Sequence, residues 1–285
     1  MTFTEYLKAE GLSQATTTTY ERYLGEFTGW LDTETIQGKD FSYGDMLGFM
    51  GELKAEGRSN ATVRHLLCVL RHYCNYLIGE GQRGDNPAAG IYVRGLIRRL
   101  PANLLSMEEM EQLCHQYSIQ LNVDDSKKIL FSLLVYQGVT TGELMRLESR
   151  DIKLQEGKIR IKGTGHSNER LLNLHAGQVP RLQTYLKQNK FKSGPLFIEQ
   201  RKERLSELNI NNRIQYMFKQ LKALNERVIN AKQIRSSVIT HWLSCHSLRQ
   251  VQYMAGHKYV SSTERYQLNH LEDLQSEVKR HHPMQ

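Results

Sequence analysis

The sequence predicts a mainly α-helical protein of two domains, the second of which carries a small three-stranded antiparallel sheet. Over most of its 285 residues, apolar side chains recur at three- and four-residue steps, the period of a helix with one buried face. Between residues 151 and 174 the period changes to two, which is typical of strands. Glycines and an Asn-Pro pair interrupt the helical pattern after residue 78. The length fits one large domain or two moderate ones, and this interruption favours two.

Residues 1–90 are predicted to form an all-helical domain. Its expected helices are 3–11, 14–31, 43–56 and 60–79. Ser13 and Ser59 stand directly before the second and fourth of these helices, where a serine hydroxyl caps the free backbone N–H groups of a helix start. The fourth helix has an apolar stripe made of Val63, Leu66, Leu67, Leu70, Tyr73 and Leu77.

The charge is unevenly placed along the chain. The net charge of +8 and the pI of about 9.2 favour a polyanionic partner. Residues 1–57 hold 4 Lys/Arg against 10 Asp/Glu, whereas residues 58–100 hold 7 against 2. Arg64 and Arg71 lie two turns apart on one face of helix 60–79. We expect this face to contact DNA; a solvated polar face is the alternative.

Residues 91–102 are expected to link the two domains. Arg94, Arg98 and Arg99 make this segment basic, and Pro101 ends it. A basic linker can follow a phosphate backbone, although it can also be a simple exposed connection.

The second domain is predicted to span residues 103–285. Ser106 with Glu109 forms the pattern of a capping box. The expected helices are 107–117, 126–137, 141–147, 178–189 and 209–224, with a helical tail at 270–280. The expected strands are 152–154, 158–162 and 170–174, and Gly163 and Gly165 allow the turn between the last two.

Three side chains near the end of the chain have complementary chemistry. Arg235 stands on a helical stretch, His257 follows Gly256, and Tyr266 comes nine residues after His257. An arginine binds a phosphate through two parallel N–H groups, and a histidine moves protons near neutral pH. A phenolic oxygen can act as a nucleophile. Together the three could break and remake a phosphodiester without a metal. A core helix followed by a surface tyrosine is the structural alternative.

Composition argues against several other classes of protein. None of the four cysteines belongs to a Cys-x-x-Cys pair, so we expect no zinc site, and we expect no cofactor. The N-terminus is too polar for a signal peptide. No apolar run approaches the length of a membrane span. We therefore expect a cytoplasmic protein with no membrane partner.

The segment Ala231–Tyr266 resembles the C-terminal signature of the tyrosine recombinase, or phage integrase, family. The matching stretches are Lys-Gln-Ile-Arg at 232–235, Thr-His-Trp-Leu at 240–243, Ala-Gly-His at 255–257 and Thr-Glu-Arg-Tyr at 263–266. The first domain also resembles the helical core-binding domain of this family, through a Ser-x-x-Thr-Val pattern that begins at Ser59 and through Asn86-Pro87.

The sequence departs from the family pattern at two positions. Lys232 replaces the histidine that opens the helix motif, which keeps a donor and loses the neutral acceptor form. Aligned on Gly138 and Glu143-Leu144, the first catalytic arginine of the family falls on Thr140. Thr140 and Glu143 read as a capping box for helix 141–147, so a helix cap is expected in the place of that arginine.

The resemblance implies a catalytic lysine at the end of the second strand, which matches Lys162. Side chains two residues apart share a face of a strand, so Arg160 is expected to point the same way as Lys162. We therefore predict that Arg160 supplies the missing guanidinium. Arg146 and Arg170 are the alternative candidates for this role.

The implied function is site-specific DNA recombination of the kind catalysed by short integrases of mobile elements. Tyr266 would form a 3′-phosphotyrosyl link. The other catalytic residues that the resemblance implies are Arg235, Lys162, His257 and Lys232. The expected partner is double-stranded DNA, bound by a homodimer or homotetramer. The alternatives are a type IB topoisomerase and a DNA-binding accessory protein with an impaired site.

Overall fold

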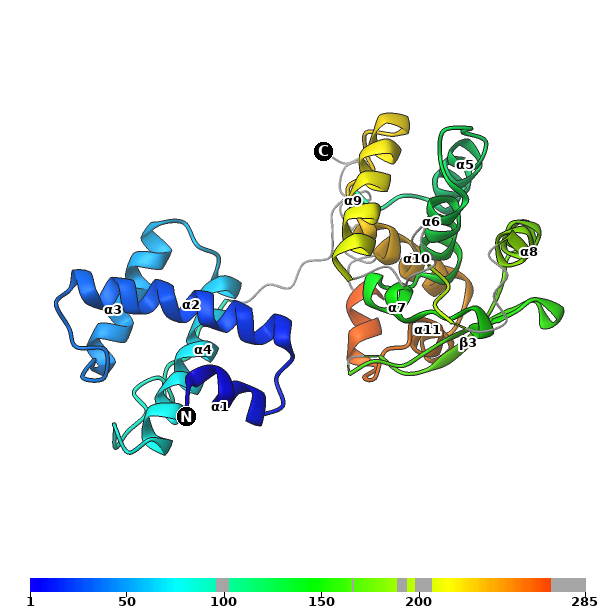
Figure 1. Ribbon diagram of the computed structural model, residues 1–285. Helices are drawn as coiled ribbons and strands as arrows, with labels where there is room; N and C mark the ends of the chain where they lie inside the picture. The colour runs from blue at the N-terminus through cyan, green and yellow to red at the C-terminus, as the bar shows by residue number, and fades with distance from the viewer. Residues whose placement is uncertain (96–102, 166, 189–193, 198–206, 268–285) are drawn as a thin grey trace, which may run out of the picture. The chain divides into compact units, whose positions relative to one another are not determined.

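The protein forms two compact units that divide between Arg98 and Arg99 (Figure 1). The computed structural model describes residues 1–95, 103–165, 167–188, 194–197 and 207–267. The division falls inside the segment 91–102 that the sequence predicts as a linker. The predicted tail helix at 270–280 lies outside the described residues.

The first unit consists of the four predicted helices. They are α1 (Phe3–Ala9), α2 (Gln14–Thr33), α3 (Tyr43–Ala55) and α4 (Asn60–Gly79). The predicted caps are confirmed, because Ser13 Oγ accepts a hydrogen bond from the N–H of Thr16 and Ser59 Oγ from that of Thr62. Each bond satisfies a backbone donor that has no partner inside its helix.

The core of the first unit forms around α4. Leu66, Leu67 and Leu70 of this helix are buried in the same cluster as Phe27 and Phe41. Ile91 is also buried in this cluster, and Val93 packs against it. The predicted linker therefore begins with residues that pack on the first unit.

The second unit is mainly helical and carries the predicted sheet. Its helices are α5 (Met107–Ser118), α6 (Asp125–Gln137), α7 (Thr141–Arg146), α8 (Val179–Gln188), α9 (Glu207–Leu224), α10 (Ala231–Cys245) and α11 (Leu248–Ala255), with short 3₁₀ turns η1 (Ser149–Asp151), η2 (Leu154–Glu156) and η3 (Ala176–Gln178). The strands β1 (Ile152–Lys153), β2 (Lys158–Ile161) and β3 (Arg170–Asn173) pair in that order, antiparallel. The three predicted strands are thus confirmed.

The register of the sheet decides which basic side chains face the interior. Ile161 lies opposite Arg170, and Arg160 lies opposite Leu171. Because directly paired residues share a face, Arg170 points to the same side as the buried Ile161, whereas Arg160 points to the other side and is exposed. Strand β3 lies beside α11 (Figure 1).

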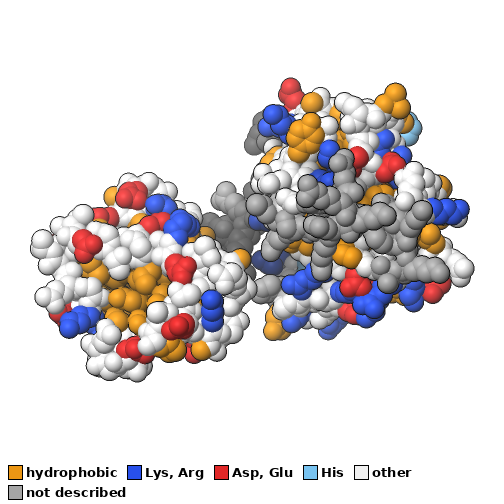
Figure 2. Space-filling model, in the orientation of Figure 1, with side chains coloured by type: hydrophobic (Ala, Val, Ile, Leu, Met, Phe, Trp, Pro, Cys, Tyr) orange, Lys and Arg blue, Asp and Glu red, His pale blue; other side chains and the backbone are white. Residues whose placement is uncertain are grey.

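The surface of the first unit mixes apolar and charged groups. Figure 2 shows apolar side chains exposed among acidic and basic ones on one face of this unit. No helix within the described ranges is long and apolar enough to cross a membrane.

Candidate active site

Three consecutive elements bring the C-terminal signature residues together. Arg235 lies on α10, within the second turn of the helix. Helix α11 ends at Gly256, whose left-handed backbone (φ 69°) turns the chain toward His257. A further helical segment begins at residue 261 and carries Tyr266. The predicted helical placement of Arg235 is confirmed.

The guanidinium of Arg235 is held by two backbone carbonyls. It donates to the carbonyl oxygen of Gly138, at the end of α6, and to that of Ala255 at 2.6 Å. Burial lowers the pKa of Arg235 below its ordinary value, although the nearby Glu143 acts in the opposite direction. Two N–H groups are thereby engaged, and an arginine has five, so the remaining ones can face a ligand.

His257 and Tyr266 lie side by side. Their ring centroids are 6.0 Å apart and their planes differ by 16°. The Nδ1 of His257 is 2.8 Å from the hydroxyl oxygen of the buried Thr263, which holds the ring in place. Burial lowers the pKa of His257 to about 4, and the charges of Arg235, Arg265 and Arg170 add to this effect. The imidazole is therefore neutral at pH 7 and able to accept a proton.

Lys162 follows directly after β2, as predicted. Its Nζ lies 2.6 Å from Glu148 Oε1 and 3.5 Å from Asp151 Oδ2. Asp151 is buried, and the second oxygen of its carboxylate has no hydrogen-bond partner in the described part of the chain. The ammonium group thus lies between two carboxylates.

Thr140 caps α7, as the sequence predicts. Its hydroxyl oxygen accepts from the N–H of Glu143 at 3.2 Å, and Glu143 Oε2 accepts from the N–H of Thr140 at 2.8 Å. The capping box explains why a short hydroxyl side chain suits this position.

The carboxylate of Glu143 also binds Arg170. Oε1 lies 2.6 Å from one terminal nitrogen of Arg170, and Oε2 lies 3.0 Å from the other. The Ser167 hydroxyl donates to Oε1 at 2.8 Å. Arg235 is the second cation, 4.0 Å from Oε2. Burial raises the pKa of Glu143, but the hydrogen bonds and charge of Arg170 outweigh this effect and bring it to about 2, so the group is ionised.

The sequence predicts Glu143 only as part of a helix cap and Arg170 only as an alternative to Arg160. The capping box is a local pattern, whereas the pairing with Arg170 joins residues 27 positions apart. The available signal was the strand register, which turns Arg170 inward when Arg160 points outward.

Arg160 and Lys232 are both exposed. Arg160 binds the carboxylate of Glu169 through two bonds of 3.0 and 2.9 Å, so its guanidinium is engaged in the free protein. Lys232 is exposed on the first turn of α10. The rival Arg146 is exposed at the end of α7. The roles of Arg160 and Lys232 stay predictions.

The predicted DNA-facing stripe on α4 forms only in part. Arg64 is exposed. Arg71 is half-buried, and it donates to the carbonyl oxygens of Ala88 at 3.0 Å and of Ile91. The guanidinium of Arg71 therefore joins α4 to the segment that follows it, and the roles of Arg64 and Arg71 in DNA binding stay predictions. Arg94 is exposed; Arg98 and Arg99 lie outside the described residues.

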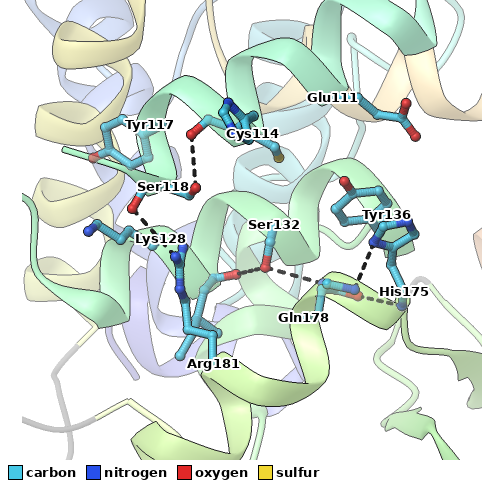
Figure 3. Close-up of a pocket in the computed structure, with 13 residues that line it drawn as sticks. Glu111, Cys114, Tyr117, Ser118, Lys128, Ser132, Tyr136, His175, Gln178 and Arg181 are labelled. Carbon is cyan, nitrogen blue, oxygen red and sulfur yellow. Dashed lines mark hydrogen bonds between the residues drawn. The ribbon is translucent and has the colours of Figure 1, made fainter.

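A separate pocket lies between α5, α6 and the η3–α8 segment (Figure 3). Its volume is about 250 Å³, and none of the predicted site residues lines it. The Gln178 amide donates to the Ser132 hydroxyl at 3.2 Å, and the Tyr136 and His175 rings stack at 4.2 Å. Its polar walls are thus bonded to one another.

Over the described ranges, no group of three or more His, Cys, Asp or Glu side chains could hold a metal ion.

Known proteins share both the sequence pattern and the fold. The Phage integrase family matches residues 103–272, and the Phage integrase N-terminal SAM-like domain matches residues 1–81. The tyrosine recombinase XerD of Proteus mirabilis is 27% identical over 281 residues, which cover 96% of this chain and 89% of the relative. The tyrosine recombinase XerC of Psychromonas ingrahamii is 29% identical over 268 residues, covering 90% of this chain and 86% of the relative.

Solved structures agree in fold. The XerH recombinase bound to its difH substrate is 20% identical with a TM-score of 0.69, and the match covers 97% of this chain and 84% of the other. A lambda integrase dimer bound to a core site is 18% identical with a TM-score of 0.66, covering 94% and 93%. On this sequence match over both units, this chain belongs to the phage integrase family of tyrosine recombinases.

Proposed function

We propose that the protein is a site-specific DNA recombinase that breaks and rejoins DNA through a phosphotyrosyl link at Tyr266. The single observation that carries this proposal is the assembly of Tyr266, His257 and Arg235 in one site. His257 lies against the phenol ring, and a phenolate at Tyr266 would raise the pKa of Arg235, so the two groups are near each other. A base and a phosphate-binding cation therefore flank the proposed nucleophile.

The chemistry is a transesterification. The Tyr266 oxygen attacks phosphorus and passes its proton to the neutral His257, while the bond from phosphorus to the 5′-oxygen breaks. Lys162 protonates the departing 5′-oxygen. A 5′-hydroxyl of another strand then reverses the step, so the energy of the bond is kept in the covalent link. Arg235 stabilises the charge on the non-bridging oxygens, and Lys232 is a further donor.

Arg160 is the candidate for a second guanidinium on the phosphate. Its pair with Glu169 is exposed, and exposed ion pairs contribute about 0–1 kcal/mol, so phosphate can displace the carboxylate. Arg160→Ala is expected to lower the rate of cleavage by roughly 100-fold, whereas Arg146→Ala has a milder effect. Normal cleavage by Arg160→Ala would remove it from the site.

The proposed partner is double-stranded DNA, bound by a homodimer or homotetramer. The lambda integrase relative is a dimer on its core site. Sedimentation of the protein with a selected duplex is expected to give two or four chains per complex. One chain per duplex at saturation would contradict this assignment.

The test is a covalent adduct. Duplexes selected for binding from a random pool, and nicked next to each candidate phosphate, are expected to trap the protein in a complex that survives denaturant. Peptide mass mapping should place the DNA on Tyr266. Tyr266→Phe should bind the same duplex and form no adduct. An adduct on Tyr253 or Tyr259 would reassign the nucleophile.

The same duplexes and adduct assay distinguish the proposed recombinase from two alternatives. An accessory protein binds DNA and forms no adduct. A type IB topoisomerase forms the adduct and relaxes supercoils, but does not exchange strands between two duplexes. The proposed recombinase gives both the adduct and exchanged products.

A further inference from the structure

The Glu143–Arg170 pair lies at the centre of the site and is fully enclosed. Both side chains are 0% exposed, and the two carboxylate oxygens each bind a different terminal nitrogen of the guanidinium. Buried ion pairs are often no more stabilising than apolar residues of the same volume, because desolvation offsets their attraction. The presence of this pair therefore calls for an explanation besides stability.

The pair joins three separate segments around the site. Glu143 accepts from the backbone at Thr140, from Ser167 in the β2–β3 hairpin and from Arg170 on β3, and it lies 4.0 Å from Arg235 on α10. The hairpin is also bonded to the His257 turn, since the N–H of Asn168 donates to the carbonyl of Gly256 at 2.8 Å. A change at Arg170 therefore reaches every one of these segments.

The Gly256–His257 turn rests directly on the Arg170 guanidinium. A Cβ placed on Gly256 would lie 2.5 Å from a terminal nitrogen of Arg170. The glycine of the Gly-His motif thus leaves room for this side chain, in addition to adopting a left-handed backbone.

Arg170 affects the charge of Arg235 through Glu143, which lies near both. Position 140 is neutral in this chain, so Arg170 and Arg235 are the two cations that contact Glu143 among the described residues. Without Arg170, the carboxylate would pair with Arg235 and neutralise it. With Arg170 occupying both oxygens, Arg235 stays at 4.0 Å, donates to Gly138 and Ala255, and keeps a net positive charge for the phosphate.

We propose that Arg170 is a positioning residue that occupies Glu143, so that Arg235 keeps the charge and orientation needed to bind the scissile phosphate. It acts in place of an arginine at position 140 without touching DNA, because it is buried. The catalytic part of this proposal rests on the proposed recombinase function, whereas the placement of Arg235 does not.

The experiment compares Arg170→Met with the double variant Glu143→Gln/Arg170→Met. Arg170→Met leaves a buried carboxylate without its main partner, so we expect a lower melting temperature. The double variant removes both charges, so its melting temperature should return toward that of the natural protein. Arg170→Met should lower the rate of adduct formation by about 100-fold, because the freed carboxylate pairs with Arg235 and small displacements of a catalytic group have effects of this size. The double variant has no carboxylate at position 143, so it should recover most of the lost rate. Arg213→Met breaks the Asp124 ion pair elsewhere in the second unit and serves as the matched control with an unchanged rate.

A second measurement does not depend on cleavage. The guanidinium N–H resonances of Arg235, assigned by their loss in Arg235→Lys, are expected to be sharp and protected from exchange in the natural protein and in Arg213→Met. They should broaden in Arg170→Met and become sharp and protected again in the double variant. If these variants still fold poorly, Arg170→Lys keeps a positive charge but cannot bind both oxygens, and it should show the same loss at Arg235.

The outcomes separate the two proposals. Recovery of stability without recovery of cleavage in the double variant, or a protected Arg235 in Arg170→Met, would overturn the positioning role. Loss of the Arg235 signal in a protein that never forms an adduct would support the positioning role and overturn the recombinase function.

Discussion

His257 carries the pH dependence of the proposed site. Burial, reinforced by three arginines, lowers its pKa from 6.5 to about 4. The neutral form that accepts the Tyr266 proton should therefore persist well below pH 6, and the rate of adduct formation should show no loss near pH 6.5. A histidine NMR titration measures the same pKa directly. A rate that halves near pH 6.5 would show that His257 is solvated in the complex.

The lowered pKa of His257 also makes folding stability depend on pH. Between pH 6.5 and about 4, the unfolded chain binds a proton at His257 that the folded chain does not. The free energy of unfolding should therefore fall as the pH falls through this window. His257→Gln should remove this part of the pH dependence, as measured by urea unfolding at pH 7 and pH 4.5.

Lys162 must leave two carboxylates before it can protonate a leaving group. If it is the general acid, Lys162→Ala should lower the rate of adduct formation by about 10²–10⁴-fold. A substrate with sulfur in place of the 5′-bridging oxygen has a leaving group that needs no proton, so it should restore most of the lost rate. Equal loss on both substrates would mean that Lys162 binds the phosphate instead.

At the scale of elements, the Gly256 turn is a test of close packing. Gly256→Ala places a left-handed φ on alanine, which costs about 1–2 kcal/mol, and it also pushes a methyl group into Arg170. Gly157→Ala is the matched control, because Gly157 has a φ of 62° and no atom within 4 Å of its added Cβ. Chemical unfolding should show the larger loss for Gly256→Ala. Equal losses would mean that Arg170 moves aside freely.

Elements with local signals could be predicted from the sequence. Helix starts at Ser13, Ser59 and Thr140 carry their own caps, and the strands follow a period of two, so both appear where expected. Contacts between distant segments could not be predicted. Arg71 reads as a surface residue by spacing, and only the returning chain at Ala88 and Ile91 supplies its acceptors. The Glu143–Arg170 pair likewise depends on how β3 packs against α7.

At the scale of the whole molecule, the charges of the first unit are unevenly distributed along its sequence. The first unit contains the acidic stretch 1–57 and also the basic surplus that begins at Arg58. The expected DNA contacts of this unit therefore lie in its basic stretch 58–95. Arg64 and Arg94 are exposed in that surplus, whereas Arg71 is bonded to backbone carbonyls.

This difference predicts separate effects on the salt dependence of DNA binding. Each phosphate contact releases counterions, so its loss lowers the slope of log affinity against log salt by about one. Arg64→Ala should lower the slope by about this amount, because its guanidinium is exposed. Arg71→Ala should leave the slope unchanged and instead weaken the packing of the 86–91 segment, at about 1–3 kcal/mol of unfolding free energy. Fluorescence anisotropy with one selected duplex, between about 50 and 200 mM salt, measures both variants.

An unchanged slope for Arg64→Ala would place the DNA on another face of the unit. A lower slope for Arg71→Ala would mean that its guanidinium leaves the carbonyls to bind phosphate.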